Sequence, residues 1–400
     1  MRVLLVAPFE SEHTKRWLQR LVQRGLEVAI LDMNGPSSTE IKEPFVYFSQ
    51  RDLFPGVWQW MVWLRKMGSW TLPLRGLAYF MSLIPLCKWL RKNKFNVVNV
   101  HWLLHPLSVL FSLQRVCPVV ATPWGSDVLL PHLQARKFRI QFQRVFYEFS
   151  LTIVTKRVDH FICDASHIRQ KLLTMLVPQD RIDLVYFGTD VEKYCASNRN
   201  EQFRRSHGAE PGDVVILSNR ILNEDVYQIS LLLRAIPIIL SSNSLTKIHI
   251  WIVGGGKDAL WLQELSEKLD LTSTVHFLGR LPDDEFATAT ASCDIYISTS
   301  PTDGGLAASV AEAMASERPV IVSDFGDNPF WLESETAGLL FSSGSHFSLA
   351  EKAVNLIRDP SAALIMGKRG RDIIVEKNNA DIEAQKVIAV YKKVSSLRVN

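Results

Sequence analysis

Cysteine is sparse in this sequence, and the cysteines are not grouped. Five are present, without a CxxC pair and without a neighbouring histidine-rich segment: Cys87, Cys117, Cys163, Cys195 and Cys293. This spacing argues against a zinc site and against a disulfide framework, and it is typical of a protein of the reducing cytosol. We therefore expect a cytoplasmic protein that needs neither a metal ion nor another cofactor.

Long apolar runs are absent as well. The longest candidate, from Gly76 to Cys87, is bounded by basic residues and is shorter than the roughly 20 residues of a membrane-spanning helix. The apolar run at the N-terminus is too short for a signal-peptide core and is followed by Glu10 and Glu12. We expect that run to be a buried first strand.

Acidic residues are scarce in the N-terminal half. Residues 1–200 hold 26 Lys and Arg against 15 Asp and Glu, which gives +11, and residues 201–400 hold 19 against 26, which gives −7; the sum is the +4 of the whole chain. A basic half favours an anionic partner, such as a phospholipid surface, a lipid phosphate or a nucleic acid. An ordinary solvated surface is an equally weighted alternative.

An aromatic and basic stretch lies within this half. Trp58, Trp60 and Trp63 stand directly before Arg65 and Lys66, and further basic residues continue to Lys94. Tryptophan beside cations is typical of interfacial membrane anchors, although the same rings could pack into a core. The sequence thus leaves open a peripheral contact of residues 57–94 with an anionic membrane, and we expect no nucleic acid partner.

Short apolar runs alternate with amphipathic segments along most of the chain. Val3–Ala7 reads as a strand, Thr14–Arg24 as a helix and Val28–Leu31 as the next strand, and a second such series begins at Val214. This alternation predicts an α/β protein with two doubly wound, Rossmann-like domains built on parallel sheets. The polar stretch 196–213 reads as the linker, which gives domains at 1–195 and 210–375 and a terminal helix in 376–400 that returns to the first domain.

The segment from Ser300 to Val322 is the most informative. It reads as a strand, a Gly304-Gly305 turn, a helix over Leu306–Ser316 and another strand. The free amides of Gly304, Gly305 and Leu306 favour an anion such as a diphosphate. Glu312 lies about 12 Å further along at 1.5 Å per residue, a separation that suits a carboxylate on ribose hydroxyls. A Gly-Gly pair alone is equally compatible with an ordinary turn.

This segment resembles the donor-binding motif of family 4 retaining glycosyltransferases, which have the two-domain GT-B fold. In that motif an acidic residue precedes, by eight positions, the Glu of Glu-Ala-Met-Ala, and a Pro-Val-Ile strand follows. Glu312-Ala-Met-Ala and Pro319-Val-Ile match it. Gly304 occupies the place of the first acid, and Asp303 stands one residue early. In the family this acid contacts hydroxyls of the donor sugar; here either Asp303 takes its place through one extra loop residue, or the first carboxylate is missing.

Other segments resemble the same family in the same order. They are His13-Thr14 through Val28, Ala121-Thr-Pro-Trp-Gly-Ser-Asp127 with Trp124 in a His position, Phe187-Gly-Thr-Asp190, Ser218-Asn-Arg220 and Phe277-Leu-Gly-Arg280. The resemblance implies that Arg220 binds the donor diphosphate, because a guanidinium matches phosphate oxygens in a fork. The family usually has a Lys five residues later, where this sequence has Asp225.

Gly254 to Gly256 follow an apolar strand and allow two interpretations. In the resemblance, Gly254 and Gly256 let the strand end approach the donor. A glycine-rich turn after a strand is also typical of an NAD-dependent dehydrogenase, but that motif needs an acid at the end of the next strand. The next strand ends Phe277-Leu-Gly, without an acid. We therefore favour the transferase and keep the oxidoreductase as an alternative.

Polar residues after the first strands are candidates for binding the acceptor. His13 follows the first strand, His101 follows Asn96–Val100, and Trp124 and Asp127 lie in the loop after Val116–Ala121. Such loops line the ligand site of doubly wound folds. Asp127 could orient an acceptor hydroxyl, while each single His is more often a loop or core residue with one hydrogen bond.

The resemblance implies an enzyme that moves a sugar from a UDP- or GDP-sugar to a glycan or a lipid-linked acceptor. It also implies retention of configuration, no metal ion, and a place in cell-envelope polysaccharide or glycolipid synthesis. Asp127 and Asp303 are the candidate catalytic carboxylates. Because Asp303 and Asp225 depart from the family pattern, a catalytically impaired binding or scaffold protein is the main alternative. A GT-B sugar epimerase is a further one, disfavoured by Glu312-Ala-Met-Ala.

Overall fold

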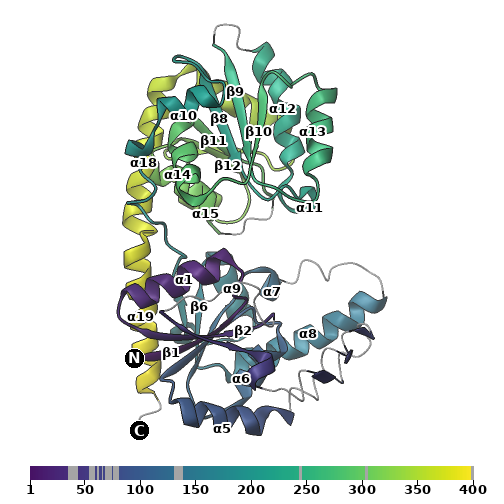
Figure 1. Cartoon of the computed structure of the whole chain (residues 1–400), viewed down its shortest axis with the longest axis vertical. Helices are drawn as coiled ribbons and strands as arrows, with labels where there is room; N and C mark the ends of the chain where they lie inside the picture. Colours follow the sequence, from purple (N-terminus) through teal and green to yellow (C-terminus); the bar gives the residue numbers. More distant parts are fainter. Residues whose placement is uncertain are drawn as a thin grey trace. The chain divides into compact units, whose positions relative to one another are not determined.

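Two compact units make up the protein (Figure 1). The structure is a computed structural model that describes residues 1–34, 44–53, 59–60, 63–64, 66–67, 74, 81–129, 138–242, 246–301 and 305–397. Unit 1 consists of Met1–Phe187 together with Asp381–Asn400, and unit 2 consists of Gly188–Ala380. The chain thus leaves unit 1 once and returns to it at the end.

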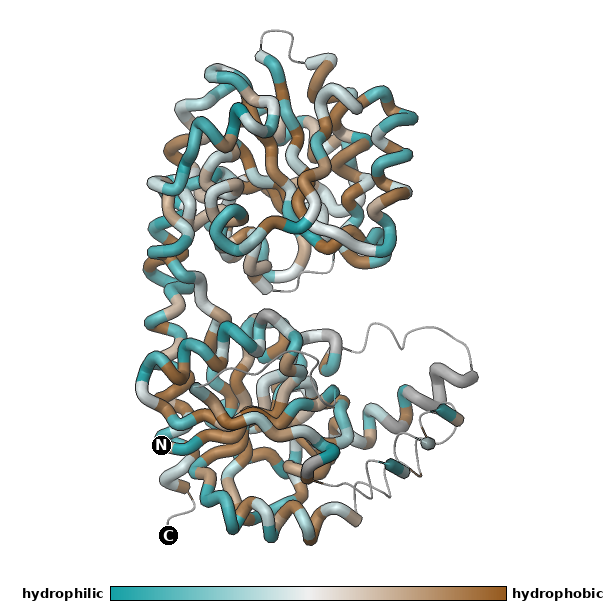
Figure 2. Tube along the Cα trace, in the orientation of Figure 1, coloured by the Kyte–Doolittle hydropathy of each residue, from teal (hydrophilic) through white to brown (hydrophobic). Residues whose placement is uncertain are grey.

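The core of unit 1 is a seven-stranded parallel sheet in the order β3-β2-β1-β4-β5-β6-β7. The strands are β1 (Arg2–Ala7), β2 (Glu27–Asp32), β3 (Val46–Ser49), β4 (Val97–His101), β5 (Val119–Thr122), β6 (His160–Cys163) and β7 (Ile182–Leu184). Most of these residues are buried, because helices cover both faces, which explains the continuous apolar runs. Figure 2 shows these runs as brown segments inside the unit.

Helices cover both faces of this sheet. The elements are α1 (Glu12–Gln23), α2 (Gln50–Leu53), α5 (Leu83–Asn93), α6 (Pro106–Leu113), α7 (Ser126–Leu129), α8 (Phe138–Arg157), α9 (Ser166–Thr174), the 3-10 helix η3 (Gln179–Arg181) and α19 (Ala380–Ser396). Alternate strand residues face opposite layers: Leu4 and Val6 pack with α5, α6, α8 and α9, whereas Val3 and Leu5 pack with α1 and α19. In β4, Asn99 therefore faces α19 and His101 faces α1, whereas Val98 and Val100 lie in the other layer.

The C-terminal helix α19 is held to unit 1 by buried polar contacts as well as by apolar packing. The hydroxyl oxygen of Tyr391 accepts hydrogen bonds from Asn99 Nδ2 (2.6 Å) on β4 and from Trp17 Nε1 (3.3 Å) on α1. Burial raises the pKa of this phenol to about 12, so the group stays neutral. The helix expected over Asp381–Val394 exists, and it belongs to the unit that begins the chain.

Unit 2 is built on a six-stranded parallel sheet in the order β10-β9-β8-β11-β12-β13. The strands are β8 (Val214–Asn219), β9 (Ile248–Val253), β10 (Val275–Gly279), β11 (Ile295–Ser298), β12 (Val320–Ser323) and β13 (Gly338–Phe341). In both units the strand order reverses beside the first strand, β1 or β8. Ligands bind at the carboxyl ends of the strands at such a reversal in doubly wound sheets.

The helices of unit 2 again form two layers. They are η4 (Ala196–Asn198), α10 (Glu201–Ser206), α11 (Glu224–Tyr227), α12 (Ile229–Ser241), α13 (Ala259–Lys268), α14 (Asp283–Ser292), α15 (Ala308–Ala315), α16 (Asn328–Trp331), α17 (His346–Arg358) and α18 (Pro360–Lys377). One layer packs α12 against α13 and α17, and α15 contacts α14 and α18 in the other. Ile216, Ile250 and Ile297 form the core beneath α12.

The predicted fold class is confirmed, and several boundaries differ from the predictions. The division between the units falls at Phe187 and Gly188 rather than at 195–210. The polar stretch 196–213 is not a linker, because it forms η4 and α10, and Arg204 there is only 2% exposed. A polar composition does not distinguish a linker from a short helix whose charged side chains pair with its own domain.

Candidate functional site

Arg220 lies directly after β8, at the carboxyl end of the unit 2 sheet. Its Nε and Nη2 atoms donate to the hydroxyl oxygen of Ser298 at 3.2 and 2.9 Å, and Ser298 ends the neighbouring strand β11. The guanidinium also lies 5.1 Å from the ring centre of Tyr227. These contacts fix a half-buried cation at the edge of the sheet where an anionic ligand is expected.

The glycines after β9 serve a contact between two loops. A Cβ atom at Gly254, where φ is +131°, would lie 2.1 Å from the carbonyl oxygen of Arg220, and one at Gly256 would lie 2.2 Å from that of Leu222. The amide of Leu222 also donates to the carbonyl of Gly255 at 3.2 Å. These glycines are therefore required by the backbone that carries Arg220. They hold the loop of Arg220 in place rather than forming an open cradle for a dinucleotide. This close packing also counts against the dehydrogenase interpretation.

A second cation lies beside the position where the family has a lysine. Lys257 Nζ, in the loop after β9, forms an ion pair with the carboxylate of Asp225. This carboxylate raises the pKa of Lys257. The sequence shows that a cation is lost at Asp225. Only the structure shows that Lys257, 32 residues later, places an ammonium group beside Asp225.

Glu312 lies on α15, and its side chain is buried. The helix begins at Ala308, two residues later than predicted, so Glu312 lies about 6 Å from the helix start at 1.5 Å per residue, whereas the predicted 12 Å counts eight residues from Gly304. Gly305 and Leu306 precede the helix and are half-buried. The hydroxyl of Ser309, in the first turn, is buried and has no hydrogen-bond partner within the described residues. Asp303 and Gly304 lie outside those residues.

In unit 1, His101 ends β4 and is almost completely buried. Its Nδ1 atom accepts a hydrogen bond from Trp124 Nε1 at 3.1 Å. An indole N–H can only donate, so Nδ1 is unprotonated and the neutral ring carries its proton on Nε2. Burial, with a smaller contribution from the charge of His13, lowers the pKa of His101 to about 3. Nε2 is buried and has no partner among the described residues, so a neutral N–H donor remains available.

Asp127 is fully buried, and its carboxylate is occupied by the backbone. Its two oxygens accept from the amides of Trp124 (2.9 Å) and Leu103 (2.7 Å). Burial raises the pKa of Asp127 to about 6, although these amides lower it. Asp127 thus joins the loop after β4 to the loop after β5, and this geometry gives it a positioning role instead of the predicted contact with an acceptor hydroxyl.

Aromatic rings surround His101. Trp17 lies edge-on to it at 5.3 Å between ring centres, and Phe187 lies 5.8 Å from Trp17. The exposed ring of His13 is 4.6 Å from Phe187 and 6.1 Å from Trp124. The three predicted acceptor residues His13, His101 and Trp124 therefore lie in one cluster. Sequence reasoning missed Trp17 as a member, because its helical spacing marked it only as a core residue.

The basic stretch proposed for membranes is described in part. Trp60 packs against the core and Trp63 is 55% exposed, whereas Trp58 and Arg65 lie outside the described residues. The helix α5 exposes Ile84 together with the basic side chains Lys88, Arg91 and Lys92. Within the described part of the chain, no helix has the length and apolar character needed to cross a bilayer.

Comparisons with known families match both units. The family described as Glycosyltransferase Family 4 matches residues 11–193, and the family described as Glycosyl transferases group 1 matches residues 198–373. Among curated proteins, the N-acetyl-alpha-D-glucosaminyl L-malate synthase of Bacillus anthracis is 20% identical over 94% of this chain and 90% of its own. The phosphatidyl-myo-inositol mannosyltransferase of Mycobacterium leprae (strain TN) is 26% identical over 99% and 98%.

Solved structures show the same fold. A glycosyltransferase from Rickettsia africae ESF-5 superposes with a TM-score of 0.74 at 14% identity, over 100% of this chain and 99% of the other. Anabaena HepE in complex with UDP gives a TM-score of 0.73 at 14% identity, over 98% and 100%. At this identity the solved structures show the fold alone. The assignment to a family comes from the two family matches, which together cover both units.

Proposed function

This chain belongs to the family 4 glycosyltransferases of the GT-B fold, and we propose that it transfers a sugar from a UDP- or GDP-sugar with retention of configuration. The observation that carries the proposal is Arg220, a cation fixed by Ser298 at the carboxyl end of β8. Arg220 and α15 follow neighbouring strands of a parallel sheet, so both lie at the same edge. A diphosphate is the group that a guanidinium and free helix amides recognise together.

In the proposed mechanism, unit 2 binds the donor. Arg220 donates to the diphosphate and stabilises the charge that develops as the sugar departs, with the amides of Gly305 and Leu306 on the same group. Lys257 supplies the second cation, so the proposal assigns no role to a metal ion. Glu312 accepts from the ribose hydroxyls, and Asp303 with Gly304 contacts the donor sugar.

Unit 1 supplies the acceptor side in this proposal. The Nε2–H of His101 donates to a hydroxyl, and its low pKa keeps the ring neutral throughout the physiological range. The rings of His13 and Trp124 offer a surface for the apolar face of a sugar. Asp127 acts through the loops that it joins, and it holds Trp124 in place by accepting from the Trp124 amide.

We assign the acceptor to the lipid-linked or glycan class, in cell-envelope polysaccharide or glycolipid synthesis. Support comes from relatives whose names specify such acceptors, such as the phosphatidyl-myo-inositol mannosyltransferase, and from the exposed face of α5. Ile84 beside Lys88, Arg91 and Lys92 suits a peripheral contact with the anionic cytoplasmic leaflet.

The membrane contact can be tested separately from catalysis. The triple variant K88Q/R91Q/K92Q should weaken binding to vesicles of phosphatidylglycerol and phosphatidylcholine about 100-fold at low salt, since each cation contributes roughly 1 kcal/mol. The matched control R234Q/K268Q/K368Q removes three exposed cations of unit 2 and should bind like the wild type. Equal binding by both triple variants would contradict the contact through α5.

The transferase proposal is tested with a panel of UDP- and GDP-sugars. Saturation-transfer NMR measures donor binding, and nucleotide release in the presence of lipid-extract acceptors measures turnover. We expect one donor class to bind and turn over, with loss of binding in E312Q. Donor binding without turnover would favour the impaired scaffold protein. Unchanged binding of every donor by E312Q would refute the site assignment.

A further inference from the structure

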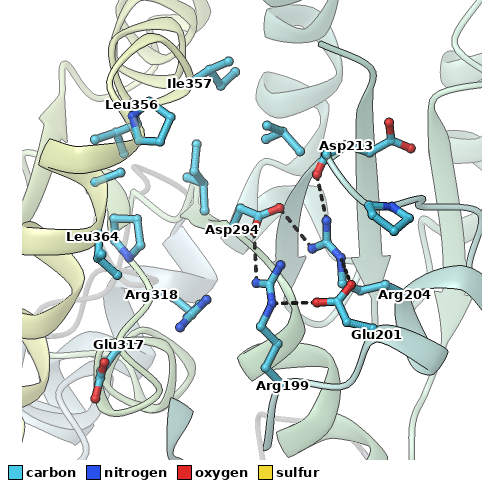
Figure 3. A pocket seen from close by; sticks show the side chains of 17 residues that line it. Arg199, Glu201, Arg204, Asp213, Asp294, Glu317, Arg318, Leu356, Ile357 and Leu364 are labelled. Atoms are coloured by element: carbon cyan, nitrogen blue, oxygen red, sulfur yellow. Dashed lines mark hydrogen bonds and ion pairs between the residues drawn. The ribbon is translucent and has the colours of Figure 1, made fainter. Parts of the chain in front are cut away.

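A cavity of about 450 Å³ lies in unit 2 apart from the candidate donor site (Figure 3). Val214, Ile295 and Pro319 line it, and they stand at or directly before the amino ends of β8, β11 and β12. In a parallel sheet the amino ends of the strands lie at the edge opposite the carboxyl ends. The cavity therefore lies across the sheet from Arg220, and the proposed transfer reaction does not use it.

Two arginines on one side of the cavity are already paired. Arg199 Nη1 and Arg204 Nη1 each lie 3.0 Å from a different oxygen of Asp294. Glu201 lies 2.9 Å from Arg199 Nε and 3.4 Å from Arg204 Nε. Two guanidinium groups thus share two carboxylates, and this part of the wall is electrically balanced.

The third arginine, Arg318, differs. Its Nε donates to the carbonyl of Ser316 at 2.9 Å and its Nη1 to the carbonyl of Cys293 at 3.2 Å, and both acceptors are neutral. Within the part of the chain that the structure describes, Arg318 forms no ion pair. Burial lowers the pKa of its guanidinium, and the charge of Arg199 also lowers it, whereas the charges of Asp294 and Glu317 raise it. Arg318 is therefore the arginine of the cavity lining that has no carboxylate of the described residues within ion-pair distance, although the lining also contains the carboxylates of Asp213 and Glu317.

The opposite wall is apolar. Leu356 and Ile357, at the end of α17, and Leu364, on α18, line the same space. Leu364 is 51% exposed although it borders a cavity. Figure 3 shows the three arginines and the apolar side chains of α17 and α18 around one space. The cavity thus brings the Arg318 guanidinium and a partly exposed apolar wall to one space.

We propose that this cavity, the Arg318 pocket, binds an amphiphilic oxyanion, that is, a phosphate monoester or carboxylate attached to a short apolar body. The oxyanion accepts from the Arg318 guanidinium, and the apolar body lies against Leu356, Ile357 and Leu364. The volume is in the range of small-ligand pockets, and the lining combines charged side chains with an apolar wall. The two chemical sources of the oxyanion are distinguished by the probes below.

The experiment measures direct binding to the full chain by isothermal titration calorimetry, with four probes: octyl phosphate, octanoate, inorganic phosphate and octanol. UDP and GDP, each at saturating concentration, are included in two parallel series, so that binding at the proposed donor site does not contribute. We expect octyl phosphate or octanoate, below its micelle concentration, to bind at least tenfold more tightly than both inorganic phosphate and octanol. Which of the two binds more tightly identifies the source as phosphate or carboxylate.

Two independent variants locate the binding. R318Q removes the cation, and L364E places a carboxylate at a half-exposed helix position that lines the pocket. Each should weaken amphiphile binding at least tenfold. I365E is the matched control, because Ile365 is the next residue on α18, is 69% exposed and does not line the pocket. Thermal unfolding of each variant verifies folding.

Equal binding of all four probes, or amphiphile binding that survives both R318Q and L364E, would overturn the proposal. Loss of binding in I365E to the same extent as in L364E would overturn it too. None of these readouts depends on sugar transfer, so a failure of the transferase proposal leaves the test intact.

Discussion

The two units share one topology, but the residues at the carboxyl ends of their sheets differ in charge. In unit 1 these ends carry histidine and tryptophan side chains, and burial keeps His101 neutral there. In unit 2 they carry the charged groups Arg220, Lys257 and, within the helix after β11, Glu312. A doubly wound sheet thus fixes where a ligand binds, while the side chains after each strand decide whether that ligand is an anion or a neutral polyol.

The comparison also shows that net charge does not describe a site. The first half of the sequence carries +11, yet His101, at the centre of its ring cluster, is neutral. The basic side chains of this half are instead exposed on surfaces such as α5. The second half is acidic overall, and it contains the cation proposed for the diphosphate.

The largest expected effect concerns the charged site. R220M should lower kcat/KM about 10²- to 10³-fold, the usual loss for a donor to developing negative charge, equivalent to roughly 3–4 kcal/mol. R234M, which removes an exposed arginine of α12, should leave kcat/KM unchanged. If a substitution in the ring cluster around His101 lowered kcat/KM more than R220M does, the comparison between the units would be reversed.

The second prediction concerns the backbone that carries Arg220. G254A should destabilise unit 2 by about 3 kcal/mol, since the new Cβ meets the Arg220 carbonyl and the backbone has a positive φ. G255A is the matched control, because its Cβ would lie no closer than 3.4 Å to any atom, the nearest being in the Arg280 side chain. Denaturant unfolding followed by tryptophan fluorescence measures the free energy of unfolding of both variants. A similar loss of stability in G254A and G255A would contradict the contact between the two loops.

The third prediction uses pH to separate two buried groups of unit 1. The folded pKa of Asp127, about 6, lies above its ordinary 3.8, so the folded state binds more protons and its contribution to stability falls as pH rises. The free energy of unfolding of the wild type, minus that of D127N, should drop by about 2 kcal/mol from pH 4 to pH 7.

His101 should show the opposite sign. Its folded pKa of about 3 lies below the ordinary 6.5, so its contribution is present above pH 6.5 and is lost as pH falls towards 3. The corresponding difference for H101Q should rise by about 3 kcal/mol from pH 4 to pH 7. Two slopes of the same sign would show that one of these groups is not buried as described.

The smallest expected effect comes from W124F, which keeps an aromatic ring at this position but removes the indole N–H that fixes the tautomer of His101. Loss of this hydrogen bond should cost about 1 kcal/mol of stability. If His101 Nε2–H binds the acceptor, KM for the acceptor should rise while KM for the donor stays constant. W261F, at an exposed position of α13, serves as the control. Equal acceptor KM values for W124F and wild type would contradict a role of the His101 tautomer in acceptor binding.

Much of the fold was predictable, because buried parallel strands leave a local signature. Val3–Ala7 and Ile248–Val253 are continuous apolar runs, and the structure has strands there. The short strand β13 and the helix α5 were missed, since Gly338–Phe341 is only four residues long and the basic residues of α5 obscure its apolar face. The boundary between the units was displaced for a similar reason, because α10 is polar in sequence and packed in structure.

The candidate site was predictable residue by residue but not contact by contact. Arg220, Glu312, His101 and Trp124 were found from their positions in family-like segments. Ser298 gave no signal, since a serine at a strand end is unremarkable until the neighbouring strand brings it under Arg220. For Asp127 the sequence predicted a contact with an acceptor hydroxyl, and it did not show that two backbone amides donate to this carboxylate.

The sequence by itself determined the alternation of strands and helices, the glycines that the loops after β9 require, and the family. These features are local, because side-chain periodicity and backbone freedom act over a few residues. Only the tertiary structure decided that Lys257 meets Asp225, that Trp124 fixes the proton of His101 on Nε2, and that Arg318 donates to two backbone carbonyls. Protonation and pairing depend on burial and on atoms from distant segments, and the chain order does not contain those distances.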